Sequence, residues 1–204
     1  MKKLLLTILI LLVTTQIAWA SQTASTSPGT MVNNDAVGTV PWLTPDNAKI
    51  SDNLYASTTL YNNQSNWLQA SNFGFAIPSN ATIDGIIVET EAKIDLGTWI
   101  LDYVRLVKGG VIGSTNKTLG VYPTTDTYKM AGTNSYLWGT TWTPSDINNS
   151  NFGITISTAQ DTSGTRIISV DHIRVTVFYT ETIVSPISVK FNSSAQIKSN
   201  LIIK

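Results

Sequence analysis

The sequence predicts an all-β protein: an antiparallel β-sandwich, jelly-roll-like, with an extra C-terminal strand-forming tail. Two observations predict this fold class. Apolar residues recur at every second position in several short segments, which is the period of a strand with one buried face. Gly, Pro, Asn and Asp separate these segments at short intervals, and convincing helical periodicity is missing. Many short strands of this kind pack as two sheets, and residues 35–182 have the length of one such domain.

The strand expected over residues 82–96 has the strongest pattern. Its apolar side chains share one face, whereas Glu89, Glu91 and Lys93 share the other. One helical turn is expected at residues 143–147, because Thr143 is a good N-cap and Pro144 suits the first helical position. Further strands are expected at residues 55–60, 67–70, 73–77, 103–108, 152–157 and 173–179.

The N-terminus has the pattern of a signal peptide, residues 1–20. Two lysines precede an apolar run over residues 4–13, and Ala18 and Ala20 place small side chains where signal peptidase requires them. The alternative is a retained membrane anchor, but the run is shorter than the roughly 20 apolar residues that a bilayer core needs. We therefore expect cleavage after Ala20, a secreted, extracellular protein, and no stable membrane insertion afterwards.

Composition limits the partners of the mature chain. Residues 21–34 are rich in Ser, Thr, Gly and Asn, and we expect them to form a flexible leader. The chain has 13 basic and 13 acidic side chains, and two of the lysines belong to the signal peptide. The mature chain therefore lacks the basic surface that binding of nucleic acid requires. The absence of cysteine excludes a thiol nucleophile, a thiolate zinc site and an iron–sulfur cluster.

Residues 183–204 are the predicted C-terminal β-strand or hairpin tail. Apolar and polar residues alternate there almost to the terminus. We expect this tail to complete the sheet edge of a second copy or of a partner surface protein, where backbone hydrogen bonds give affinity. The alternatives are that it folds back on its own domain, forms a hairpin, or begins a larger module. The residues assigned to assembly are Ile187, Val189, Phe191, Ile197, Leu201 and Ile203.

A set of motifs marks residues 40–180. They include Asn72–Pro78, Ala81–Ile86, Val104–Gly110, Leu137–Gly139 with Trp142, Asn151–Gly153 and Val170–Val175. With these motifs the chain resembles a poorly characterised β-sandwich module of surface and tail-type proteins of bacteria and their phages. The resemblance implies a β-sandwich in an extracellular setting, and it implies no catalytic residues.

The residues do not predict an enzyme. A hydrolytic triad needs a base beside its nucleophile, and the single histidine, His172, lies in the last strand, with no nucleophile-elbow pattern around any serine. One imidazole also cannot supply a usual zinc site. Glu89 and Glu91 share a strand face about 7 Å apart, which is compatible with acid–base chemistry. Lys93 on the same face favours the simpler interpretation, an ordinary exposed strand face.

Calcium is the ion that the sequence favours most. Asp46 and Asp52, together with Asn47 and Asn53, make an oxygen-rich loop, and Ca²⁺ is held by carboxylate and carbonyl oxygens. The spacing matches no defined calcium loop, and Asp and Asn also form ordinary turns. No cofactor is therefore expected, with Ca²⁺ at Asp46 and Asp52 as the alternative.

Two functions remain open on the sequence. The first is a secreted, non-enzymatic structural or adhesive protein, a subunit of an extracellular assembly that uses its C-terminal strand. The alternative is a carbohydrate-binding module that presents exposed aromatic rings to a glycan. Its candidate platforms are Trp99, Trp42 and Trp67, with Trp99 first because it follows a strand break. The competing interpretation is that aromatic residues fill the core, as expected for Trp138 and Trp142.

Overall fold

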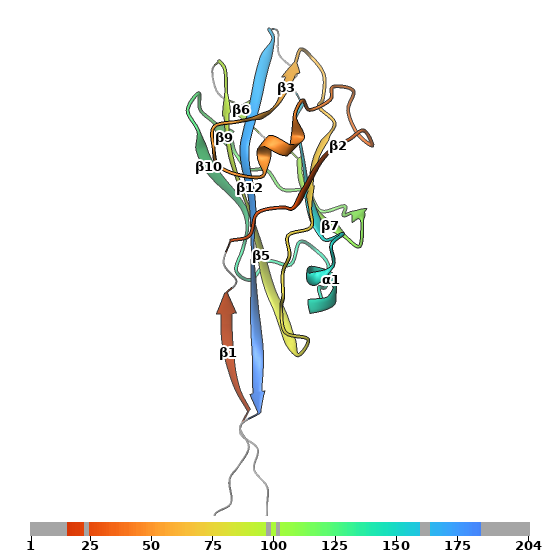
Figure 1. Ribbon diagram of the computed structural model, residues 1–204, viewed down its shortest axis with the longest axis vertical. Coiled ribbons are helices and arrows are strands. Elements are labelled where there is room, and N and C mark those ends of the chain that lie inside the picture. Colours follow the sequence, from red (N-terminus) through yellow and green to blue (C-terminus); the bar gives the residue numbers. More distant parts are fainter. Residues whose placement is uncertain (1–15, 23–24, 97–98, 101–102, 160–163, 185–204) are drawn as a thin grey trace, which may run out of the picture.

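The computed structural model describes residues 16–22, 25–96, 99–100, 103–159 and 164–184, and these form an antiparallel β-sandwich (Figure 1). The elements are β1 (Gln16–Gln22), β2 (Thr30–Asn34), η1 (Pro45–Ala48), β3 (Ala56–Leu60), β4 (Trp67–Ser71), β5 (Ala81–Ile94), β6 (Trp99–Ile100), β7 (Tyr103–Lys108), β8 (Val111–Ile112), β9 (Val121–Tyr122), β10 (Thr127–Thr133), α1 (Pro144–Asn148), β11 (Gly153–Ser157) and β12 (Arg166–Val184). The predicted all-β class is confirmed.

Two five-stranded sheets make the layers. The first has the order β1-β12-β5-β10, with β3 also paired to β12, and the second has the order β2-β4-β11-β7-β8. Strands β6 and β9 form a separate pair. Most connections cross from one sheet to the other, since β2, β4, β7 and β11 belong to the second sheet and β3, β5, β10 and β12 to the first. This alternation is typical of jelly-roll-like sandwiches.

The core lies between the sheets and follows the two-residue period of the strands. Val88 of β5 pairs with Val175 of β12, and both are fully buried in one apolar cluster with Ile154 of β11 and with Phe152, which precedes β11. Each such side chain contributes about 1.5–3 kcal/mol when it is removed from water, so this alternation holds the layers together. Leu96, expected on the same face, is exposed because β5 ends at Ile94.

The predicted flexible leader contains part of the sandwich. Residues 30–34 form β2, which pairs with β4, and Met31 is buried in the core. The edge of β4 offers backbone groups to a further strand, and Met31 adds apolar burial, so this segment is ordered despite its polar composition. Strand β1 spans the predicted cleavage site after Ala20 and pairs with residues 178–184 of β12. Cleavage itself remains a prediction.

The segment 73–77, expected to be a strand, is extended but does not join a sheet. Its side chains Phe73, Phe75 and Ile77 are buried, so the alternation in the sequence is real. The amide side chain of Asn148 replaces a partner strand: its Oδ1 accepts from Ile77 N at 2.8 Å, and its Nδ2 donates to Ile77 O at 2.8 Å. The helical turn that supplies Asn148 is α1, and its predicted cap, Thr143, forms a full capping box.

The C-terminal end of β12 leads away from the sandwich (Figure 1). β12 continues to Val184, and residues 185–204 lie outside the described part of the chain, as do all the residues assigned to assembly: Ile187, Val189, Phe191, Ile197, Leu201 and Ile203. Within the described residues, no helix is both long enough and apolar enough to span a membrane.

Candidate functional site

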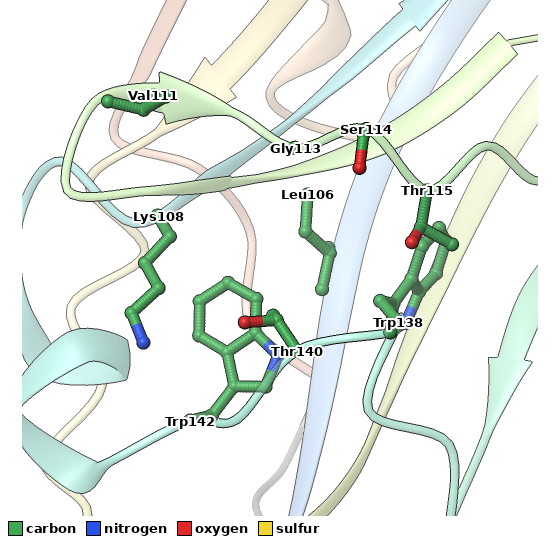
Figure 2. Close-up of a pocket in the computed structure, with 10 residues that line it drawn as sticks. Leu106, Lys108, Val111, Gly113, Ser114, Thr115, Trp138, Thr140 and Trp142 are labelled. Atoms are coloured by element: carbon green, nitrogen blue, oxygen red, sulfur yellow. The ribbon is translucent and has the colours of Figure 1, made fainter.

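A cavity of about 380 Å³ lies between the β7–β8 hairpin and the loop that follows β10. Figure 2 shows Lys108, Trp142 and Thr140 to one side of Leu106, and Trp138 and Thr115 to the other. We call this cavity the neutral pocket. Its full lining is Leu106, Lys108, Val111, Gly113, Ser114, Thr115, Trp138, Gly139, Thr140 and Trp142.

Two turns shape the neutral pocket. The turn at Gly109-Gly110 reverses β7 into β8, and both glycines have positive φ. On the other side, Trp138 has φ 57° and Gly139 has φ 71°, so the chain bends sharply through left-handed backbone. A Cβ at position 139 would lie 2.6 Å from Thr115 Oγ1. Glycine at this position therefore allows the two loops to approach each other.

Two indoles form the apolar part of the neutral pocket. Trp138 and Trp142 are only 3% and 7% exposed, as expected for packing residues. Trp138 Nε1 donates to Ile86 O at 3.0 Å, and Trp142 Nε1 donates to Leu137 O at 3.0 Å. Because both N–H groups are already bonded inside the protein, the indoles offer the pocket carbon surface and no free donor.

The pocket has no uncompensated charge. The Lys108 ammonium donates to the Thr141 carbonyl at 2.8 Å, lies 3.0 Å from the Asp146 carboxylate and sits 5.4 Å from the Trp142 ring centroid. Burial alone would raise the pKa of Asp146, but the hydrogen bonds from Thr143 and the charge of Lys108 together lower it. The remaining polar groups of the lining side chains are the hydroxyls of Ser114, Thr115 and Thr140.

The predicted platform Trp42 is a core residue. It is 3% exposed, and its Nε1 donates to Asn66 O at 2.9 Å inside the protein. A ring so little exposed is not an open platform, and Trp42 does not line the neutral pocket, so its position does not favour the predicted binding role. Trp99 lies in β6 opposite Tyr122, and its side chain is outside the described part of the structure. Whether Trp99 binds a ligand stays a prediction.

Trp67, the third predicted platform, is 4% exposed and therefore is not an open platform. It nevertheless lines a second cavity, of about 260 Å³, together with Tyr103 and Arg105. The Arg105 guanidinium carbon lies 5.4 Å from the Trp67 ring centroid, and the Tyr103 ring meets Trp67 edge-on with 6.5 Å between centroids.

The residues proposed for calcium have separate partners. The Asp46 carboxylate lies 2.7 Å from Lys49 Nζ at the end of η1, and the Asp52 carboxylate accepts from Leu54 N at 3.0 Å, closing a turn. In the described ranges, no group of three or more His, Asp or Glu side chains is placed to hold a metal ion. The Asp46 side chain is therefore an ion-pair partner and that of Asp52 closes a turn, and calcium binding at these residues stays a prediction.

The acidic and imidazole side chains of the first sheet also have local partners. Glu89 receives a bidentate contact from Arg174, 2.9 Å from each carboxylate oxygen, so it is the acceptor of an ion pair. His172 is 8% exposed, and its ring nitrogens lie 2.8 Å from Ser27 Oγ and 2.8 Å from Tyr128 Oη. Burial lowers the pKa of His172, and the charge of Arg174 lowers it further. This imidazole is part of the internal packing of the sheet.

Sequence reasoning missed the residues that the fold brings together. Ser114, Thr115 and Thr140 come from two loops that are separated along the chain and meet only in the folded protein. The glycines beside them, Gly113 and Gly139, were the available signal, since glycine marks close approach of backbone.

No protein-family model matches the chain, and no curated protein matches it. Among solved structures, the chain is similar to one described as "CBM4 structure and function", at 8% identity and a TM-score of 0.38, over 71% of this chain and 92% of that one. It is also similar to one described as "Family 16 Carbohydrate Binding Module-2", at 16% identity and a TM-score of 0.33, over 70% of this chain and 89% of that one. At TM-scores this low, neither likeness supports an argument about ligand or site.

Proposed function

We propose that this protein is a secreted, non-enzymatic glycan-binding module and that the neutral pocket holds a neutral sugar unit. The observation that carries the proposal is the composition of the lining. Carbon surface from two indoles lies beside the hydroxyls of Ser114, Thr115 and Thr140, and the one ammonium is already paired with Asp146.

A sugar ring fits this chemistry on two counts. Its C–H face packs on aromatic carbon, and its hydroxyls exchange hydrogen bonds with neutral side-chain hydroxyls. A charged ligand would find no counter-charge, because the carboxylate of Asp146 compensates Lys108. The cavity of about 380 Å³ lies at the small end of usual ligand pockets, which suits one or two sugar units.

A binding role also agrees with the groups that the lining lacks. No Asp, Glu or His is among the residues that line the neutral pocket. Glycoside hydrolysis uses a pair of carboxyl groups flanking the bond to be cleaved. The lining therefore supports retention of a glycan without cleavage.

A panel of neutral oligosaccharides, with binding measured by calorimetry, tests this proposal. We expect Thr140→Val to weaken binding about five- to tenfold, the cost of one lost hydrogen bond. Thr141→Val is the matched control, because Thr141 is exposed on the same loop and its side chain does not line the pocket. Equal affinities of the two variants, or no binding to any neutral glycan, would reject the proposal.

A second candidate function is assembly through the edge of β12. β1 occupies residues 178–184 of this edge, but the predicted cleavage would remove residues 16–20 of β1. On the other side of β12, β5 reaches only Glu181. The edge at Thr180–Val184 would then offer unpaired backbone groups, which are a template for another strand.

The occupant that we infer is the alternating tail, residues 187–203, of a second copy. The seven-residue pairing of β1 supports this inference, because it demonstrates that the edge accepts an antiparallel strand. Light scattering of the mature chain should give a multimer, and deletion of residues 185–204 should give a monomer. A mass unaffected by this deletion would reject assembly through the tail.

A further inference from the structure

The cavity beside Trp67 has a different electrostatic character from the neutral pocket. Its lining consists of Ala36, Val37, Gln64, Trp67, Tyr103 and Arg105. Arg105 and Trp67 lie on the outer face of the second sheet, because they alternate with the core residues Leu106 and Leu68. We call this cavity the arginine pocket.

Among the described residues, Arg105 forms no ion pair with a carboxylate. Its Nε is buried and has no hydrogen-bond partner in this part of the chain, and the guanidinium carbon lies over the Trp67 ring, 5.4 Å from its centroid. Arg174 shows the usual arrangement by contrast, with both ends of Glu89 bound at 2.9 Å. A guanidinium carries five N–H donors, and a buried donor without an acceptor costs free energy. A ligand with a carboxylate would supply an acceptor for this guanidinium.

The walls of the arginine pocket indicate what kind of anion fits. The guanidinium carbon of Arg105 lies over the Trp67 ring, and the Tyr103 ring stands edge-on to Trp67 at 87°. Gln64, whose Nε2 donates to Ser157 Oγ at 3.1 Å, adds an oriented amide. A matching ligand has a carboxylate for Arg105, a compact ring whose C–H groups pack on the aromatic side chains, and hydroxyl groups for the Gln64 amide.

We propose that the arginine pocket binds a uronic-acid unit, a sugar that carries a carboxylate. The carboxylate receives two parallel N–H bonds from Arg105, and the C–H face of the ring packs on Tyr103. The volume of about 260 Å³ admits a single unit. The sugar part of this assignment rests on the proposed glycan-binding function, whereas the recognition of a carboxylate rests on Arg105 alone.

Titration of the full chain with glucuronate, glucose and acetate, followed by NMR of the tryptophan side chains, tests the assignment. Glucuronate should bind at least about tenfold more tightly than glucose, since bonds to a charged group are the stronger ones. Arg105→Gln should abolish this difference, and Arg105→Lys, which keeps the charge but loses the planar fork, should restore it in part. The control is Arg166→Gln, because Arg166 lies in β12 of the first sheet and should leave both affinities unchanged.

Several results would overturn the assignment. Equal affinity of the wild-type chain for glucuronate and glucose would remove carboxylate recognition. Acetate binding as tightly as glucuronate would show that the sugar ring is not recognised. If Arg166→Gln lost the preference for glucuronate as fully as Arg105→Gln, the preference would come from the overall charge of the protein. The proposed function is tested separately, because Thr140 lines only the neutral pocket. Thr140→Val should weaken binding of neutral glycans without changing binding of glucuronate.

Discussion

The indole nitrogen of Trp138 donates a hydrogen bond of 3.0 Å to the backbone carbonyl of Ile86, and this bond ties a wall of the neutral pocket to the first sheet. Gly132 of β10 lies against the same carbonyl, because a Cβ at position 132 would overlap the Ile86 oxygen. The loop after β10 and the sheet are therefore joined at one backbone group, and the shape of the pocket depends on it.

Replacement of Gly132 tests this junction. In Gly132→Ala the new methyl group must displace the Ile86 carbonyl, and alanine must also adopt φ +90°, so we expect the free energy of unfolding to fall by about 2–4 kcal/mol. Gly74→Ala is the matched control, since Gly74 has φ +71° but has no atom within 4 Å of the Cβ position. Its loss should be about 1 kcal/mol. Equal losses in urea denaturation would show that the contact with Ile86 is unimportant.

Trp42 is expected to contribute to stability and to have no part in binding. Trp42→Phe leaves the carbonyl of Asn66 without its buried donor, so the free energy of unfolding should fall by about 1–3 kcal/mol. Glycan affinity should be unchanged. Tyr61→Phe, on a ring that is 62% exposed, should alter stability by less than about 0.5 kcal/mol. A loss of glycan binding by folded Trp42→Phe would contradict the assignment of Trp42 to the core.

His172 should make the fold less stable in mild acid. Burial lowers the pKa of His172 in the native chain, so below the unfolded value of about 6.5 the unfolded chain binds more protons. The free energy of unfolding must therefore decrease as the pH falls through about 6.5 towards the lower native pKa. Around the ring, Glu91 and Glu89 oppose this shift, whereas Arg174 adds to it. Tyr128 and Ser27 contact the ring nitrogens.

Urea midpoints at about pH 7.5 and about pH 5.5 measure this effect. We expect a lower midpoint at the acid value for the wild-type chain and a smaller difference for His172→Gln. Asp171 acts in another window: burial raises its pKa, so its contribution to stability is lost as the pH rises above about 3.9. The same midpoint difference in the variant and the wild-type chain would remove His172 as the cause.

The strands that alternate strictly could be predicted from the sequence, and the reason is physical. β5, β7 and β12 bury one face, so each apolar position is fixed by the two-residue period. β2 was missed because its sequence, Thr30–Asn34, is polar apart from Met31 and Val32; its pairing comes from the available edge of β4. The segment 73–77 has the two-residue alternation of a strand but no partner strand. The side chain of Asn148 instead makes hydrogen bonds with its backbone at Ile77.

The candidate site was less predictable than the fold. Tryptophan in a sequence indicates a large apolar surface but not whether the fold covers it, and Trp42 is covered. The neutral pocket depends on Thr115 and Thr140 meeting across two loops, which is a long-range relationship. Arg105 could not be singled out from the sequence either, since only the fold shows that its buried Nε has no hydrogen-bond partner among the described residues.

The most direct test of glycan binding is the response of the tryptophan side-chain N–H signals to a neutral oligosaccharide in ¹H–¹⁵N NMR spectra. Saturable shifts should occur for Trp138 and Trp142, because their rings line the neutral pocket, while Trp42 stays unchanged in the core. Unchanged Trp138 and Trp142 signals at saturating oligosaccharide would contradict the assignment of the pocket as the glycan site.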